Sequence, residues 1–137
     1  MPDQSFNARE RLKSRKLIQQ LFKEGQNTFA YPLKWVYLPV EFDPDSPPVQ
    51  FTVSVSKKTF KKAVDRNLLK RRIKEAYRLS KSEYIDRLKN SQKTFAVMAV
   101  YVGKTVEDYD TIQKSVLRNW NKMIRELTEK ADLNNKD

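Results

Sequence analysis

The sequence contains no cysteine and no histidine, and only two glycines, Gly25 and Gly103. The first two absences exclude a disulfide framework, a thiol nucleophile, a Cys/His zinc site and an imidazole general base. Two glycines also cannot form the G-x-G-x-x-G loop or a Walker-type loop that binds phosphate. An enzyme that works through a nucleophile and a base is therefore not expected.

Long apolar runs are missing as well. No stretch approaches the roughly 20 apolar residues of a membrane-spanning helix, and no charged-then-apolar leader precedes a small-residue cleavage site. The 137 residues suit one domain with one core. We therefore expect a single cytoplasmic domain over residues 1–137, with an ordered core at about 9–127 and polar, frayed ends.

Positive charge is present in excess and in one place. The chain carries 28 Lys+Arg against 17 Asp+Glu, and residues 57–93 alone hold 14 basic and 4 acidic side chains. Such a patch attracts polyanions, and contact with several phosphates releases counterions, so nucleic acid is the expected partner. An anionic membrane surface is the alternative, but it would require Trp, Phe or Leu opposite the lysines, and both Trp residues lie outside this stretch.

Apolar side chains at helical spacing predict three helices. The expected ranges are residues 14–24, 65–80 and 109–127. Ser14, Asp65 and Asp108 are the expected N-caps, and Gly25 is expected as the glycine just past the end of the first helix.

Three segments are typical of strands, with β-branched and aromatic residues or strict alternation. They are residues 33–40, 50–56 and 95–102. The first two are predicted to form an antiparallel hairpin, with a further short pairing near Tyr31. The third is apolar on both faces, as a covered strand would be. The order αββαβα indicates a small α+β domain with a three- or four-stranded sheet.

Residues 54–81 combine a polar strand end with a basic helix, and hold 11 basic and 2 acidic residues. A helix of this kind can lie along a phosphate backbone, with arginines forked onto phosphate oxygens. A solvated helix face is the alternative interpretation. After the first residue of the expected helix, the only acidic residue is Glu75. The basic side chains therefore have few acidic partners within the helix, and this favours binding to an anion.

This stretch resembles the signature of the bacterial ribonuclease P protein component. Residues 54–58 read SVSKK and residues 63–78 read AVDRNLLKRRIKEAYR, where the family has a strand ending in SVSKK and then an Arg-Asn-Arg helix. The likeness extends from about residue 9 to 127. It departs at Leu68, which replaces the third member of the triplet, at Lys74 in place of Arg, at Ile18 in place of Phe, and in lacking a Gly before Ala63.

The resemblance implies an αβββαβα domain with a small mixed sheet, ribosomal protein S5 domain 2-like, with a left-handed βαβ crossover. It also implies an accessory subunit of an RNA enzyme that removes the 5′ leader from precursor tRNA. The expected partners are the RNA subunit and precursor tRNA, without a membrane or a small-molecule substrate. Mg²⁺ is expected to be held mainly by the RNA, with no metal site and no catalytic residue in the protein.

Two groups of binding residues follow. The side chains expected to face the catalytic RNA are Arg66, Asn67, Lys70, Arg71, Lys74, Lys57 and Lys58. The leader is single-stranded, so an aromatic and basic groove is expected to hold it, formed by Phe22, Lys34, Tyr37 and Ser54. Packing of Phe22 in the core is an equally weighted alternative, whereas Trp35 and Trp120 are expected in the core.

Two other functions stay open. A ribosomal or other structural RNA-binding protein would share this composition and is separated only by the Arg66-Asn67 signature. A metal-dependent nuclease could use Glu107, Asp108 and Asp110, but acidic residues are expected at a helix start for electrostatic reasons.

Overall fold

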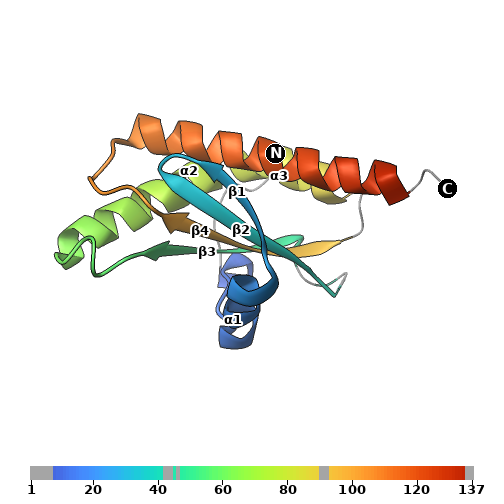
Figure 1. The fold of residues 1–137 in the computed structure, drawn as a ribbon, viewed down its shortest axis with the longest axis horizontal. Coiled ribbons are helices and arrows are strands. Elements are labelled where there is room, and N and C mark those ends of the chain that lie inside the picture. The colour runs from blue at the N-terminus through green and yellow to red at the C-terminus, as the bar shows by residue number, and fades with distance from the viewer. Residues whose placement is uncertain (1–7, 42–44, 46, 90–92, 135–137) are drawn as a thin grey trace.

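The computed structural model describes residues 8–41, 45, 47–89 and 93–134, with the side chains of all of these except residues 8, 89 and 130–134. The expected loose N-terminal residues before 8 lie outside this part of the chain. Along the chain the elements are η1 (Ala8–Glu10), α1 (Arg15–Glu24), β1 (Gln26–Ala30), β2 (Leu33–Val40), β3 (Val49–Val55), α2 (Ala63–Lys89), β4 (Thr94–Tyr101) and α3 (Tyr109–Asn134). The predicted αβββαβα order of a small α+β domain is confirmed (Figure 1).

The four strands form one mixed sheet in the order β1-β2-β4-β3. β4 pairs antiparallel with β2 and parallel with β3, so it lies inside the sheet, which explains its apolar sequence. The predicted hairpin of β2 and β3 is therefore wrong, because β4 separates them. The real hairpin joins β1 and β2 through Tyr31 and Pro32, where the further short pairing was expected.

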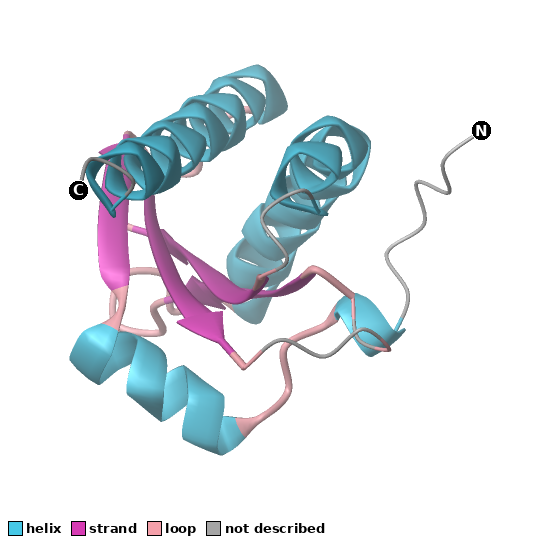
Figure 2. Ribbon diagram, turned by 90° about the vertical axis from the view of Figure 1, so that its right-hand side faces the viewer, coloured by secondary structure: helices cyan, strands magenta, loops and turns pink. Residues whose placement is uncertain are grey.

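The helices cover the sheet unequally. α2 and α3 lie side by side on one face, and the shorter α1 lies on the other (Figure 2). Strand residues alternate between these faces: Trp35 joins the large core under α2 and α3, whereas Val36 joins the small core under α1. Part of the α1 face consequently stays open to solvent.

The starts of α1 and α3 agree with the sequence, and α1 ends at Glu24 as expected. α3 instead continues to Asn134, past its expected end at 127, so the tail expected to be frayed is helical over residues 128–134. The Ser14 side chain accepts from the Leu17 amide at 3.3 Å, and Asp108 Oδ1 accepts from the Thr111 amide at 2.9 Å, so both N-caps are confirmed. α2 differs, because it begins at Ala63 and continues to Lys89. Asp65 therefore lies within its first turn and is not its N-cap.

Gly25 ends α1 without adopting a left-handed conformation, since its φ is −66°. The glycine is required for another reason. A Cβ atom there would lie 2.4 Å from the Leu21 carbonyl oxygen and 2.6 Å from Cγ1 of Val36. The close approach of α1 to β2 leaves no room for a side chain.

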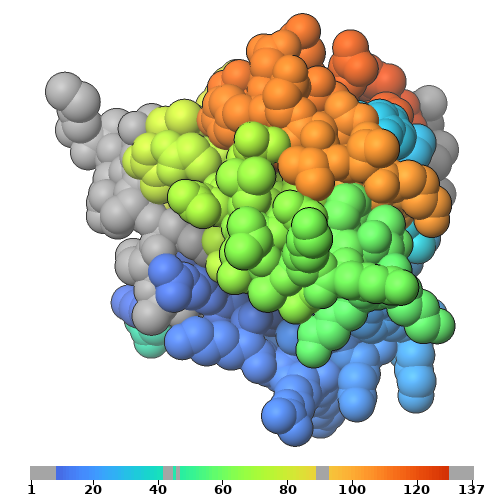
Figure 3. All heavy atoms as spheres, turned by 90° about the vertical axis from the view of Figure 1, so that its left-hand side faces the viewer, coloured from blue at the N-terminus to red at the C-terminus, as the bar shows by residue number. Residues whose placement is uncertain are grey.

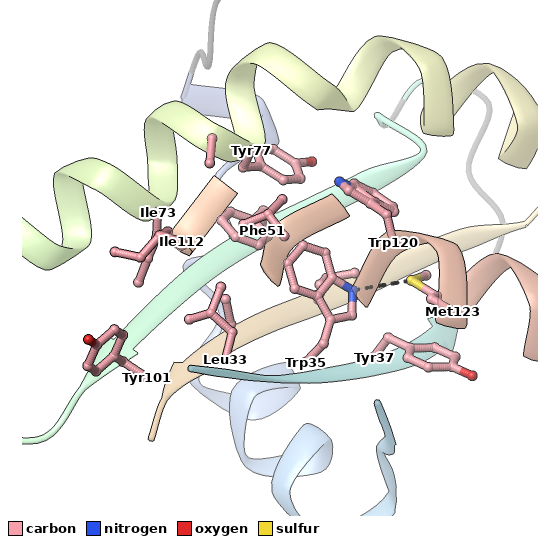
Figure 4. Close-up of a cluster of buried hydrophobic side chains, with 14 of the residues drawn as sticks. Leu33, Trp35, Tyr37, Phe51, Ile73, Tyr77, Tyr101, Ile112, Trp120 and Met123 are labelled. Atoms are coloured by element: carbon pink, nitrogen blue, oxygen red, sulfur yellow. Dashed lines mark hydrogen bonds between the residues drawn. The ribbon is translucent and has the colours of Figure 1, made fainter. Parts of the chain in front are cut away.

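Aromatic rings fill the centre of the large core, as Figure 4 shows. Phe51 stacks on Tyr77 with ring centroids 3.9 Å apart, and the rings of Trp35 and Trp120 lie 5.3 Å apart. Both tryptophans are fully buried, which confirms their predicted core positions. Among the described residues, no helix has the length and apolarity needed to cross a membrane.

Candidate nucleic-acid interface

The segment from β3 into α2 presents a basic surface. Leu69, Ile73 and Tyr77 are fully buried on one side of α2, which turns the polar side of the helix outward. The predicted RNA-facing residues that are exposed are Lys57, Lys58, Asn67, Arg71 and Lys74, and Lys70 is half-buried. In Figure 3 this segment is green, and its side chains project between the blue N-terminal part of the chain and the orange part, which comprises the first turns of α3 and the residues that precede them.

Arg66 differs from these neighbours. Its Nη1 donates to the carbonyl oxygens of Phe60 at 2.8 Å and Lys61 at 2.9 Å. The side chain is half-buried and folds back onto the loop before the helix. Arg66 was expected to face the catalytic RNA, and in the structure its guanidinium is engaged within the protein.

The open face of the sheet carries a row of residues across all four strands. Phe29 of β1 pairs with Lys34, Lys34 with Val100, and Val100 with Ser54. Cross-strand partners point to the same face, and this row lies on the face that α1 covers only in part. The Phe29 side chain is 52% exposed, so an aromatic ring and an ammonium group lie beside each other on this surface.

Phe22 lies on α1 above the same face and is 67% exposed. The alternative of a core position for Phe22 is therefore wrong. Leu21 next to it packs against the sheet and is only 1% exposed.

Tyr37 does not belong to this surface. It is fully buried on the opposite face of the sheet, and its hydroxyl donates to Glu126 Oε2 on α3 at 2.5 Å. Burial, and then the hydrogen bond to a carboxylate, raise the pKa of Tyr37 well above its usual range. The assignment of Tyr37 to the leader groove is corrected accordingly, since Lys34 and Tyr37 differ by an odd number of positions on one strand.

Phe29 is the aromatic residue that lies exposed beside Lys34, where Tyr37 was expected from the sequence. It was missed because β1 has only five residues and no clear apolar alternation. The sequence does carry one usable signal: a strand before Tyr31 and Pro32 would bring Phe29 opposite Lys34 through a two-residue turn.

The acidic residues at the start of α3, Glu107, Asp108 and Asp110, are engaged within the protein. Glu107 accepts a hydrogen bond from the Tyr31 hydroxyl at 3.0 Å, and Asp110 forms an ion pair with Lys114 at 3.0 Å. The hydrogen bonds from Thr111 lower the pKa of Asp108, as expected for a helix cap. Within the ranges that the structure describes, no three acidic side chains are grouped as metal ligands. The nuclease alternative gains no support from this geometry.

Comparison with known proteins identifies the family of the chain. The family model described as Ribonuclease P matches residues 6–128. This chain belongs to the ribonuclease P protein family. The resemblance read from residues 54–78 is thereby confirmed, and with it a role as protein component of a tRNA-processing ribonucleoprotein that has an RNA partner.

Relatives of known sequence and structure agree. The ribonuclease P protein component of Porphyromonas gingivalis is 34% identical over 110 residues, which cover 80% of each chain. That of Chlorobium phaeobacteroides is 31% identical and covers 83% of this chain and 84% of the relative. The RNase P protein of Staphylococcus aureus superposes with a TM-score of 0.64 at 20% identity, covering 83% of this chain and 94% of that one. The Thermotoga maritima RNase P protein gives 0.61 at 23% identity, covering 80% and 93%. These two structures show that the fold is shared.

Proposed function

We propose that this ribonuclease P protein binds the catalytic RNA with α2 and the 5′ leader of precursor tRNA with the open face of the sheet. The RNA subunit carries out the Mg²⁺-dependent cleavage that gives the mature 5′ end of the tRNA. The protein increases cleavage by gripping the leader and by supporting the active conformation of the RNA.

The open sheet face is the observation that carries this proposal. A single strand binds to proteins through bases stacked on aromatic rings and phosphates in a basic groove. Phe22 and Phe29 supply exposed rings, Lys34 supplies the charge, and Ser54 ends the same cross-strand row. Of the predicted groove residues, Phe22, Lys34 and Ser54 therefore lie on one side of the sheet, and Tyr37 lies on the other.

The two surfaces are continuous through β3. Ser54 lies on the open face, and the chain then leads directly into Lys57, Lys58 and the basic side of α2. A precursor tRNA that is held by the RNA bound at α2 could therefore place its single-stranded leader on the open face of the sheet. Asn67, exposed on α2, can donate and accept at once, which suits a base edge, a 2′-hydroxyl or a metal-bound water.

Mg²⁺ is assigned to the RNA. The acidic residues at the start of α3 cap the helix or bind other protein groups, and this supports a protein that supplies positioning and charge. Phosphate oxygens of the RNA are hard ligands of the kind that Mg²⁺ prefers.

Reconstitution tests the proposal. The protein, the cognate RNA subunit and precursor tRNA are mixed at low Mg²⁺, and cleavage is measured with leaders of different lengths. Cleavage is expected to rise on addition of the protein, and more for a long leader than for a single leader nucleotide. A protein that binds the RNA but leaves cleavage unchanged would be a structural RNA-binding protein, and the proposal would fail.

Surface variants separate the two binding surfaces. The triple variant Lys70→Ala, Arg71→Ala, Lys74→Ala should weaken binding to the RNA subunit. The slope of the logarithm of the binding constant against the logarithm of the salt concentration should become shallower by about 0.9 for each phosphate that is no longer neutralised. Lys34→Ala with Phe29→Ala should instead weaken binding of the leader. Arg118→Ala is the matched control, because Arg118 is exposed on α3. Equal losses of affinity for the RNA subunit and for the leader in all three variants would contradict two separate binding surfaces.

A further inference from the structure

The connection between β3 and α2, residues 56–62, is held in a compact form, and we refer to it as the lysine loop. Its Phe60 amide donates to the Ser56 carbonyl oxygen at 3.0 Å, and the Lys58 amide donates to the Ser56 side chain at 3.1 Å. Phe60 is 7% exposed, and its ring packs edge-on against that of Tyr101 with centroids 5.6 Å apart. The middle of the lysine loop is thus anchored in the core.

Arg66 provides a second anchor from the helix. One nitrogen of its guanidinium, Nη1, donates to two successive carbonyls, those of Phe60 and Lys61. Two hydrogens on one planar nitrogen can reach both oxygens at once. The end of the lysine loop is therefore fixed against the first turns of α2.

The anchored loop carries four exposed ammonium groups. Lys57 and Lys58 precede Phe60, and Lys61 and Lys62 follow it. We propose that Arg66 is a positioning residue, which fixes the lysine loop so that these four lysines meet RNA phosphates as a preformed set. This inference rests on the proposed function, since it concerns how the same surface binds RNA. A loop that is ordered before binding loses less conformational entropy when the RNA arrives, so its order contributes to affinity.

The conservative variant Arg66→Lys separates the contribution of the planar double donor from that of the positive charge. It keeps the positive charge, but a tetrahedral ammonium on a flexible stem does not replace the planar double donor. Arg71→Lys is the matched control, because Arg71 is exposed on the same helix. If Arg66 acts on the lysine loop, Arg66→Lys weakens RNA binding about tenfold more than Arg71→Lys, the factor expected for the removal of one charge-assisted hydrogen bond.

Amide hydrogen exchange in the free protein examines the lysine loop without RNA. Exchange at Lys58 and Phe60 should rise in Arg66→Lys and Arg66→Ala, and should stay unchanged in Arg71→Lys. Unchanged exchange in both Arg66 variants would overturn the inference. Failure of the wild-type protein to bind the RNA subunit would instead overturn the proposed function, so the two failures are distinguishable.

A double-mutant cycle completes the test with the full ribonucleoprotein. Arg66→Lys is combined with alanine at all four lysines of the loop, and RNA affinity is measured over a series of salt concentrations. We expect Arg66→Lys to lower the salt dependence in the wild-type background and to have no further effect once the lysines are absent. An equal loss of affinity in both backgrounds, with unchanged salt dependence in each, would show direct contact and refute positioning.

Discussion

The ammonium group of Lys81 lies 2.8 and 2.7 Å from the two carboxylate oxygens of Glu10. The pair joins the N-terminal turn η1 to the middle of α2, and the Lys81 side chain is only 3% exposed. The same N-terminal segment pairs with the edge of the sheet, because the Leu12 amide donates to the Phe51 carbonyl oxygen at 2.9 Å. An ion pair thus fastens the segment that covers β3.

Glu10→Gln should therefore destabilise the fold. The variant removes the negative charge beside a buried ammonium, and breaking a buried pair in this way costs about 3–5 kcal/mol. Urea denaturation measures the free energy of unfolding. Glu83→Gln is the control, since Glu83 pairs with Arg87 in the open and should change stability by less than about 1 kcal/mol. Equal losses in the two variants would show that the buried pair is not special.

The parts of the fold that depend on local periodicity were predictable. Leu69, Ile73 and Tyr77 repeat at helical spacing, and all three are buried under α2. The pairing of the strands was not predictable in the same way. β2 and β3 are close in sequence, but β4 enters between them from about forty residues further on, and only its apolarity on both faces indicated an interior position.

The candidate site shows the same division. Basic residues on α2 could be located from their spacing, because a helix buries one side and exposes the other. Lys34 and Tyr37 lie three positions apart on one strand and therefore point to opposite faces, so the sequence already excluded a groove that contains both. Which of the two faces stays open depends on how the helices pack, and one strand alone does not fix this. The bonds of Arg66 to the carbonyls of Phe60 and Lys61 leave no trace in the sequence, since a backbone acceptor has no residue type.

Gly25→Ala should destabilise the protein through steric overlap, not through backbone strain. The new Cβ would press on the Leu21 carbonyl oxygen, and overpacking of this kind costs about 1–3 kcal/mol. Gly103→Ala is the matched control, because its nearest neighbour would be a ring carbon of Tyr101 at 3.1 Å. Thermal unfolding of both variants measures the difference. A smaller loss for Gly25→Ala than for Gly103→Ala would contradict the close approach of α1 to β2.

Stability should fall in alkaline solution because of buried tyrosines. Burial raises the pKa of Tyr37 and of Tyr77 from an ordinary value of 10.0, with the Glu126 hydrogen bond adding to Tyr37 and the Glu10 charge adding to Tyr77. The folded protein keeps both hydroxyls protonated, whereas the unfolded chain ionises them near pH 10. Their contribution is therefore complete below about pH 10 and is lost as the pH rises above it.

Urea unfolding between about pH 8 and pH 11 measures this loss. Tyr37→Phe removes one of the two groups, so the free energy of unfolding of this variant should fall less steeply above pH 10 than that of the wild type. Other groups titrate in the same range, but they are common to both proteins. If the free energy of unfolding falls with pH equally steeply in Tyr37→Phe and in the wild type, Tyr37 ionises equally easily in the folded and unfolded chains.

Phe22 and Leu21 are neighbours with opposite environments, and alanine at each should give opposite results. Phe22→Ala removes an exposed ring, so stability should change by less than about 0.5 kcal/mol, while affinity for a leader-containing precursor should fall by about 1–3 kcal/mol, the contribution of one stacked base. Leu21→Ala should cost about 2–5 kcal/mol of stability, because this side chain is buried between α1 and the sheet.

Binding of precursor tRNA to the reconstituted ribonucleoprotein, measured with and without a leader, separates these effects. Phe22→Ala should bind leaderless tRNA as the wild type does, because the ring is expected to stack only on the leader. Phe29→Ala should behave in the same way, since Phe29 lies on the open face beside Lys34. If Phe22→Ala loses the same affinity for both RNAs, the ring does not touch the leader, and the open sheet face is then not its binding site.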